Sequence, residues 1–186
     1  LMTHGFFKAL LFLSAGSVIH SMNHEQDMRK MGGLYKKIPF TGTMMWIGSL
    51  AIIGFPYFSG YYSKEIILEN AYFVSSGMAK YAYVVGIITA LLTAFYSWRL
   101  LFLTFHGETR STKDLYEQVH ESPKVMTLPL FILAIGSIFS GIILSDYFIG
   151  NKQDIFWHHV IVLSHDVHHH MPFIQTLIIK SSVAIG

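Results

Sequence analysis

Long apolar stretches, separated by shorter polar ones, divide this chain of 186 residues. Four of these stretches are complete and a further one opens near the end of the sequence: about 1–22, 38–74, 81–105, 126–149 and from Met171 onward. About 20 apolar residues in a row are enough for a helix to cross the hydrocarbon core of a bilayer. The pattern therefore predicts an all-α, polytopic transmembrane helical protein with four complete spans and part of a fifth.

The stretch 38–74 is too long for one straight span. As a single helix it would measure about 55 Å, whereas the hydrocarbon core is about 30 Å thick. Glycine, proline and serine interrupt it between residues 54 and 60, just before Lys64 and Glu65. Two arrangements remain open. Either residues 63–74 lie along the membrane surface, or the stretch is a broken helix whose unwound middle is shielded by protein, as at many ion sites.

Lys64 and Glu65 are the first candidates for chemistry. A lysine at the break of a membrane helix can carry a proton, because burial disfavours its charged form and lets it load and unload. Glu65 would then modulate that charge. The alternative is that Ser63 begins a short surface helix on which both side chains are solvated, as charges near span ends usually are.

His4 and Lys8 form a second candidate pair. They are four residues apart in the first stretch, so they share one helix face. A neutral imidazole can pass a proton through either ring nitrogen, and a lysine one turn away can receive it through water. Alternatively, Lys8 extends to the membrane surface and His4 is a hydrogen-bonded core residue.

Composition supports the membrane assignment and narrows the chemistry. Hydrophobic residues make up 52% of the chain and charged residues only 13%, with a mean hydropathy of +0.46. A net charge of +2 without a Lys/Arg block argues against nucleic-acid binding. The chain has no cysteine, which excludes disulfides, thiolate-held clusters and a cysteine nucleophile. We therefore expect no cofactor in this chain, and a lipid bilayer as its surroundings.

Loop charges predict how the chain is oriented. Most lysines and arginines of the loops lie in 23–37 and 106–124, so both loops are expected on the cytoplasmic side. The loop 150–170 would then lie on the outer face, and it is rich in metal-ligating side chains: His158, His159, His165, Asp166, His168, His169 and His170. These residues lack a defined ligand spacing, so we assign no metal to them.

Three segments resemble one known family. They read LMTHGFFKALLFLSAGSVIHSMNHEQDMRKMGGL, KKIPFTGTMMWIGSLAIIGFPYFSGYYSKEIIL and YSWRLLFLTFHG, and they cover most of residues 1–107. They are similar to the L-type antiporter-like membrane subunit of proton-pumping NADH:quinone oxidoreductase, respiratory complex I. The resemblance implies two inverted five-helix repeats, each with a broken helix. Residues 1–107 would supply the last three helices of the second repeat, with the broken helix at 38–74, and residues 108–186 the C-terminal loops and helices.

The resemblance also implies roles for particular residues. His4 and Lys8 match the histidine and lysine of the helix before the broken one, Lys64 matches the lysine of the broken helix, and Glu65 stands where an acid is found. The implied function is proton translocation through this relay, driven by quinone reduction elsewhere in an enzyme complex. The implied surroundings are the bacterial or mitochondrial inner membrane, with other complex I membrane subunits as partners.

The chain departs from the family pattern, because the first repeat and the long lateral helix have no counterpart in it. We therefore expect a truncated piece, a separately encoded piece that assembles with an N-terminal half, or a remnant. Two other functions stay open. One is a subunit of a multi-subunit sodium/proton antiporter, and the other is a structural piece that transports nothing.

Overall fold

The computed structural model of the protein describes residues 2–148, 152–158 and 160. In this part of the chain there are helices and loops and no strands, which confirms the all-α prediction. The α-helices are α1 (Met2–Ser21), α2 (Pro39–Ile53), α3 (Ser59–Phe73), α4 (Gly77–Phe105), α5 (Lys113–Gln118), α6 (Lys124–Phe148) and α7 (Gln153–Trp157), with short 3-10 turns at Met28–Lys30 and Leu34–Lys36. The span expected from Met171 and most of the histidine-rich loop lie outside the described residues.

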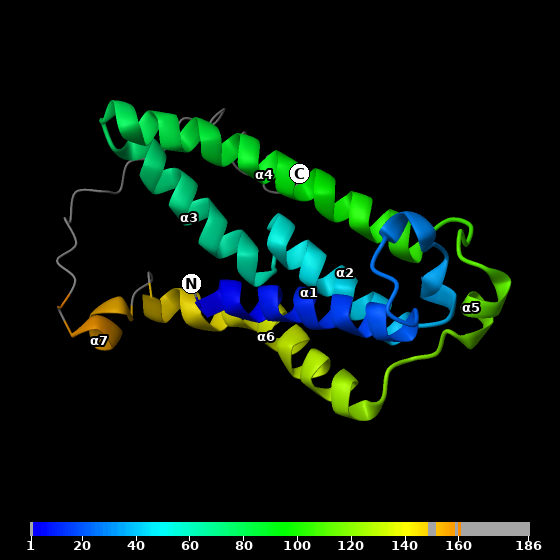
Figure 1. The fold of residues 1–186 in the computed structure, drawn as a ribbon. Coiled ribbons are helices and arrows are strands. Elements are labelled where there is room, and N and C mark those ends of the chain that lie inside the picture. The colour runs from blue at the N-terminus through cyan, green and yellow to red at the C-terminus, as the bar shows by residue number, and fades with distance from the viewer. Residues whose placement is uncertain (1, 149–151, 159, 161–186) are drawn as a thin grey trace.

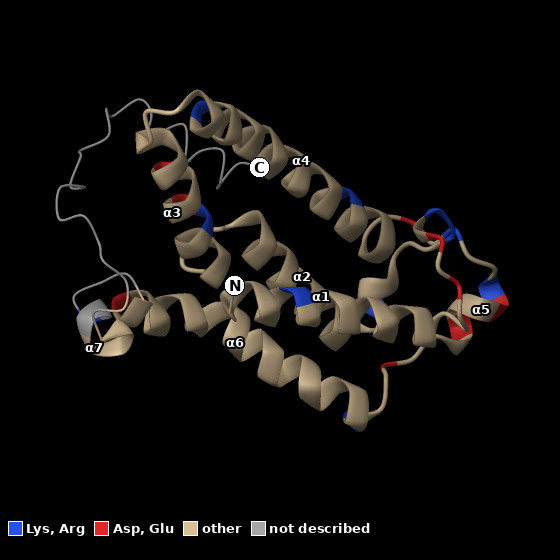
Figure 2. Ribbon diagram, turned by 60° about the vertical axis from the view of Figure 1, so that its left-hand side comes forward, with Lys and Arg blue, Asp and Glu red and all other residues tan. Residues whose placement is uncertain are grey.

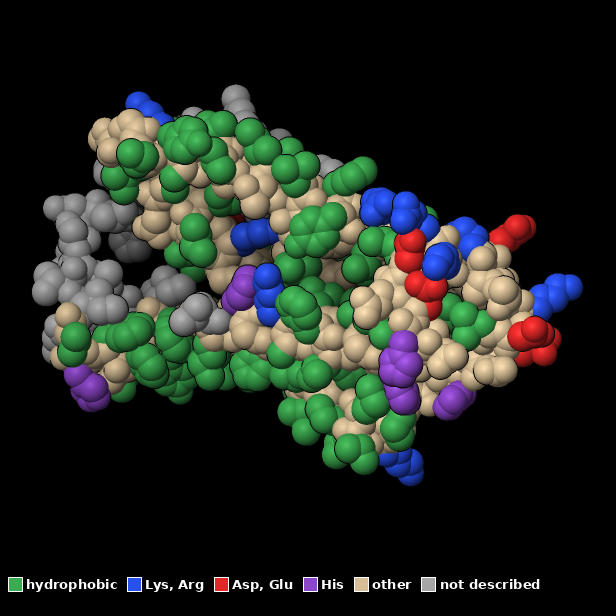
Figure 3. All heavy atoms as spheres, viewed as in Figure 1, with side chains coloured by type: hydrophobic (Ala, Val, Ile, Leu, Met, Phe, Trp, Pro, Cys, Tyr) green, Lys and Arg blue, Asp and Glu red, His purple; other side chains and the backbone are tan. Residues whose placement is uncertain are grey.

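Three of these helices, α1, α4 and α6, are long and apolar enough to cross a membrane, and α2 is a shorter apolar helix. α1 packs against α2 and α6, while α3 bridges α6 and α4 (Figure 1). Large apolar side chains cover the outside, among them Phe12 and Phe95, which are 74% and 69% exposed. Figure 3 shows this apolar cover along the helices. Such a surface fits a lipid environment or further helices, and the chain is a multi-pass membrane protein.

Close helix packing depends on small side chains. A Cβ atom at Gly136 would lie 2.4 Å from the Phe6 ring, and one at Gly141 would lie 2.6 Å from the Cα atom of Ser59. The two glycines thus bring α6 close to α1 and α3, as expected for helices that pack in lipid.

Two predicted boundaries are corrected. α4 begins at Gly77, because the Ser76 hydroxyl accepts a hydrogen bond from the Met78 backbone N–H at 3.3 Å and caps the helix. The predicted start of the third apolar stretch, at about residue 81, is therefore four residues too late. α6 spans Lys124–Phe148, one or two residues earlier at each end than predicted.

The loops at 23–37 and 106–124, the first and third loops of the chain, lie together at one end of the bundle. The Arg110 guanidinium donates to the backbone carbonyl of Arg29 at 2.9 Å, and the Tyr116 hydroxyl donates to that of Gly33 at 3.0 Å. Figure 2 shows the charged residues gathered at this end, around α5. The prediction that both loops share one side is confirmed, and their cytoplasmic location stays a prediction.

Candidate functional site at the helix break

The predicted break in the second apolar stretch is confirmed. α2 ends at Ile53, and Gly54 follows in the left-handed region with φ 93°. The N–H groups of Gly54 and Phe55 both donate to the Leu50 carbonyl, at 3.1 and 2.9 Å, which closes the last turn of α2. α3 begins at Ser59, which is fully buried. The break therefore lies against protein at its α3 end, which favours the broken helix over a surface helix that starts at residue 63.

Gly60 lets the two halves of the broken helix meet. A Cβ atom at this position would lie 1.8 Å from the Ala51 carbonyl oxygen, and 3.6 Å from the Phe7 ring. Only a glycine allows this approach, because the obstructing atom belongs to the backbone of α2. The first turn of α3 is thus held directly against the last turn of α2.

This contact places Lys64 at the C-terminus of α2. Its Nζ atom donates to the carbonyl oxygens of Ile52 and Ile53, at 3.1 and 3.0 Å. Carbonyls in the last turn of a helix have no partner within the helix, and together they carry a partial negative charge. The prediction placed Lys64 near the break, and the structure adds these two backbone partners for its ammonium group.

Glu65 points in another direction, because consecutive helix residues differ by about 100°. Its carboxylate interacts with the hydroxyl of Tyr61, one turn earlier on α3. The two adjacent charged residues therefore have different partners.

Lys8 lies on α1, in the turn that follows His4. It lines a cavity of about 240 Å³ between α1, α2 and α4, together with the hydroxyl-bearing Ser49 and Ser97. The same cavity is lined by Ile52, whose carbonyl accepts from Lys64. Basic and histidine side chains lie together at the centre of the face in Figure 3. The cavity beside Lys8 thus extends to the residue that binds Lys64.

His4 lies one turn before Lys8 on α1. It is exposed in the described part of the chain, and its ring meets the edge of Phe7 with a centroid distance of 5.0 Å. The predicted roles of His4, Lys8, Lys64 and Glu65 stay predictions. Ile52 is shared by the surroundings of the two lysines, because it lines the cavity beside Lys8 and its carbonyl accepts from Lys64.

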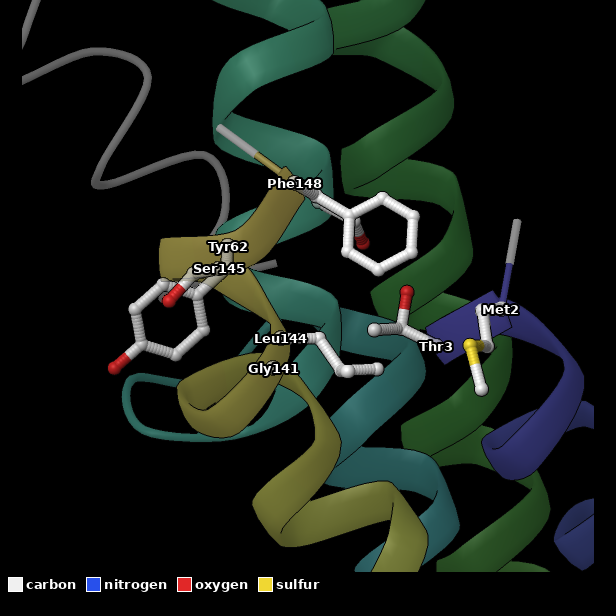
Figure 4. A pocket seen from close by; sticks show the side chains of 8 residues that line it. Met2, Thr3, Tyr62, Gly141, Leu144, Ser145 and Phe148 are labelled. Carbon is white, nitrogen blue, oxygen red and sulfur yellow. The ribbon is translucent and has the colours of Figure 1, made fainter. Parts of the chain in front are cut away.

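A second cavity, of about 130 Å³, lies near the start of α1 (Figure 4). Its walls are contributed by α1, α3 and α6 and combine hydroxyl groups with apolar side chains: Met2, Thr3, Tyr62, Ser63, Gly141, Leu144, Ser145 and Phe148. Tyr62 and Ser63 belong to the first turns of α3, so this cavity extends to the residue directly before Lys64. Among the described residues no three His, Cys, Asp or Glu side chains group in a way that could hold a metal ion.

Sequence reasoning missed the role of Glu121. Its carboxylate accepts from the backbone N–H groups of Phe40 at 3.0 Å and Thr41 at 3.3 Å, and from the Thr41 hydroxyl. One sequence signal shows that an acceptor of this kind is needed. α2 begins with Pro39, and the residue before it, Ile38, has no side chain that can cap the helix. The free N–H groups of α2 therefore need an acceptor from elsewhere in the chain.

Comparison with known proteins assigns a family. Residues 1–93 match the family described as NADH:quinone oxidoreductase/Mrp antiporter, TM, and residues 96–163 match the family described as NADH dehydrogenase subunit 5 C-terminus. Similar curated proteins include NADH-ubiquinone oxidoreductase chain 5 of Metridium senile, 52% identical over 88% of this chain. NADH-quinone oxidoreductase subunit L of Rhodobacter capsulatus is 51% identical over 84% of it.

These relatives are longer than this chain, which spans 26% of the Metridium protein and 23% of the Rhodobacter protein. Residues 1–93 contain α1, the broken helix α2–α3 and the first half of α4, so the matched segment holds His4, Lys8 and Lys64. The chain belongs to the NADH:quinone oxidoreductase/Mrp antiporter family of transmembrane proteins.

Proposed function

We propose that this chain is a proton-translocating part of the membrane arm of NADH:quinone oxidoreductase. In this function it passes protons through His4, Lys8 and Lys64, with Glu65 beside them, and quinone reduction elsewhere in the complex drives the transfer. No electrons pass through the chain. Its location would be the inner membrane of a bacterium or mitochondrion, and its partners the other membrane subunits of the complex and a polypeptide that supplies the N-terminal half.

The observation that carries the proposal is the position of the Lys64 ammonium on two carbonyls at the end of α2. A charged ammonium offers three donors and is attracted to the negative end of the helix dipole. A neutral amine loses one donor and the charge. Gain or loss of a proton at Lys64 therefore changes how firmly α3 is bound to α2, which couples proton transfer to the packing of the broken helix.

Lys8 completes the relay because its cavity reaches Ile52. Two lysines near one another disfavour a second positive charge, so arrival of a proton on one favours its release from the other. The cavity beside Lys8 has room for water, and Ser49 and Ser97 give it hydrogen-bonding groups. A proton can thus move from the His4 and Lys8 face of α1 to the break through hydrogen-bonded water.

The test is replacement of Lys64 in the assembled complex, reconstituted in vesicles. Lys64→Ala should reduce protons pumped per NADH oxidised, while NADH oxidation with an artificial acceptor stays intact. Lys64→Arg separates proton transfer from charge, because an arginine keeps a positive donor at the carbonyls and does not release its proton. It should assemble normally and still pump poorly.

Lys80→Ala is the matched control, because Lys80 is an exposed lysine near the start of α4. Its replacement should leave pumping unchanged. Full pumping by both Lys64 variants would contradict the assignment. Full pumping after combined loss of Lys8 and Lys64 would instead favour a structural piece that transports nothing.

A second candidate is sodium/proton antiport, because the family matched over residues 1–93 includes Mrp antiporters. The same lysines would then exchange protons for sodium ions across the membrane. Sodium transport in vesicles without NADH, abolished by Lys64→Ala, would favour antiport. Proton transport that needs NADH and ignores sodium would exclude it.

A further inference from the structure

A buried group of hydroxyls joins α1, α2 and the segment between α5 and α6. The Ser17 Oγ atom lies 3.0 Å from Thr41 Oγ1 and 2.6 Å from Ser122 Oγ, and the Ser122 hydroxyl donates to the Ser17 carbonyl at 3.4 Å. Thr41 Oγ1 in turn contacts the Glu121 carboxylate. Ser17 and Thr41 are fully buried, and Ser122 is 6% exposed. These four residues, the Glu121 cluster, connect a loop carboxylate to the interior of the bundle.

Counting hydrogens shows that the Glu121 cluster can hold one additional proton. Its three hydroxyls carry three hydrogens, whereas the structure contains four contacts that each need one: Glu121 to Thr41, Thr41 to Ser17, Ser17 to Ser122, and Ser122 to the Ser17 carbonyl. With Glu121 ionised, only three of the four can be hydrogen bonds at one time. With Glu121 protonated, its own O–H supplies the fourth, and every contact is made.

The ionised form has its own stabilisation. The carboxylate accepts from the N–H groups of Phe40 and Thr41 at the N-terminus of α2, where the helix dipole favours negative charge. The ionised and the protonated carboxyl of Glu121 therefore both have hydrogen-bond partners. A group that passes protons repeatedly needs partners in both states.

The position of the Glu121 cluster suits uptake from the loop side. Glu121 is half-buried at the end where the first and third loops meet, and the titratable side chains beside it in sequence or on α1 are exposed: His20, His120 and Lys124. Inward along α1, the next polar group on the buried face is Ser14. Its hydroxyl is fully buried and has no hydrogen-bond partner among the described residues.

We propose that Glu121, with Thr41, Ser17 and Ser122, is a proton-uptake site on the loop side of the bundle, an inference that rests on the proposed function. Water at the loop surface gives a proton to the carboxylate. Glu121 then passes it to Thr41 as the hydroxyl proton of Thr41 moves to Ser17 and that of Ser17 moves to a water molecule on the Ser14 side. One proton is taken up and one released, each hydroxyl stays neutral, and the carboxylate is restored.

Glu121→Gln in the assembled complex tests the carboxylate. Glutamine keeps an oxygen that accepts from the α2 N–H groups, but it cannot carry a proton. We expect normal assembly and a loss of protons pumped per NADH. Glu117→Gln, an exposed carboxylate on α5 of the same loop, is the matched control and should pump as the unaltered protein does.

Thr41 variants separate proton transfer from a structural role. Thr41→Val keeps the side-chain shape and removes the hydroxyl, so it should also lose pumping, whereas Thr41→Ser restores the hydroxyl and should recover it. Normal pumping by Glu121→Gln and Thr41→Val, with pumping lost in Lys64→Ala, would overturn this inference alone. Equal loss of assembly in Glu121→Gln, Thr41→Val and Thr41→Ser would overturn it in favour of a structural role. Normal pumping by Lys64→Ala would overturn the proposed function itself.

Discussion

Gly60→Ala should separate the two halves of the broken helix. The new Cβ atom would lie 1.8 Å from the Ala51 carbonyl oxygen, whereas a carbon and an oxygen in contact are about 3.3 Å apart. α3 must therefore move by about 1.5 Å away from α2, because the obstructing atom is backbone and cannot rotate aside. Lys64 lies one turn further along α3, so its contacts of 3.0 and 3.1 Å with the α2 carbonyls would lengthen beyond hydrogen-bond distance.

The expected cost combines two effects. Overpacking of this kind costs about 1–3 kcal/mol, and each lost hydrogen bond to a charged group costs about 1.5–3 kcal/mol. Alanine offsets about 1 kcal/mol through its better helix propensity. Because the long Lys64 side chain can readjust and recover part of the lost contacts, we expect a net loss of about 3 kcal/mol in the free energy that keeps the break closed.

Hydrogen exchange measures this loss locally. A change of about 3 kcal/mol corresponds to roughly 100-fold faster exchange of amides protected by the closed break. The relevant amides are those of Gly54, Phe55 and Tyr61, in a peptide covering residues 50–62 of the assembled protein. Gly16→Ala is the control, since a Cβ atom there has no neighbour within 4 Å in the described structure. Unchanged exchange in the Gly60→Ala peptide would refute the argument that this glycine holds α3 against α2.

Two further predictions concern the loop end. The side chain and backbone N–H of Arg29 hydrogen-bond to Asp27 and lower the pKa of its carboxyl from 3.8 to about 2. The interaction between ionised Asp27 and Arg29 therefore stabilises the folded loop fully above a pH of about 4. This stabilisation is lost as the pH falls through about 2. Titration of the Asp27 carboxyl by isotope-edited infrared spectroscopy, with Asp27→Asn as the blank, should therefore show a midpoint well below 3.8. Arg110→Ala removes donors to the Arg29, Met28 and Leu103 carbonyls and should speed limited proteolysis within residues 106–112, whereas Lys113→Ala on the same loop should not.

Much of the fold could be predicted because local sequence determines it. Gly54, Pro56 and Gly60 mark the break, and apolar length alone marks the spans. The same-side placement of the loops at 23–37 and 106–124 followed from their lysines and arginines. The break is caused by residues that are close together in the sequence. The spans and the side on which each loop lies follow from the bilayer, which every apolar stretch of sufficient length crosses.

The remaining features depend on contacts between distant segments. The partners of Lys64 are backbone carbonyls, which every residue has, so no side-chain pattern could indicate Ile52 and Ile53. Nothing in the sequence around Glu121 indicates its partners, because its role arises only when the segment after α5 returns to the start of α2. The unfilled cap at Ile38 shows that an acceptor is needed, but it does not show which residue provides it.

The contact between Thr41 and Glu121 also orders events during synthesis of the protein. The two residues are 80 positions apart, so a ribosome that adds about 5–20 residues per second needs roughly 4–16 s to pass from one to the other. During that interval the start of α2 has no carboxylate to bind its amides. The first turn of α2 is therefore synthesised well before its acceptor. The contact that joins α2 to the third loop forms only after Glu121 has been added to the chain.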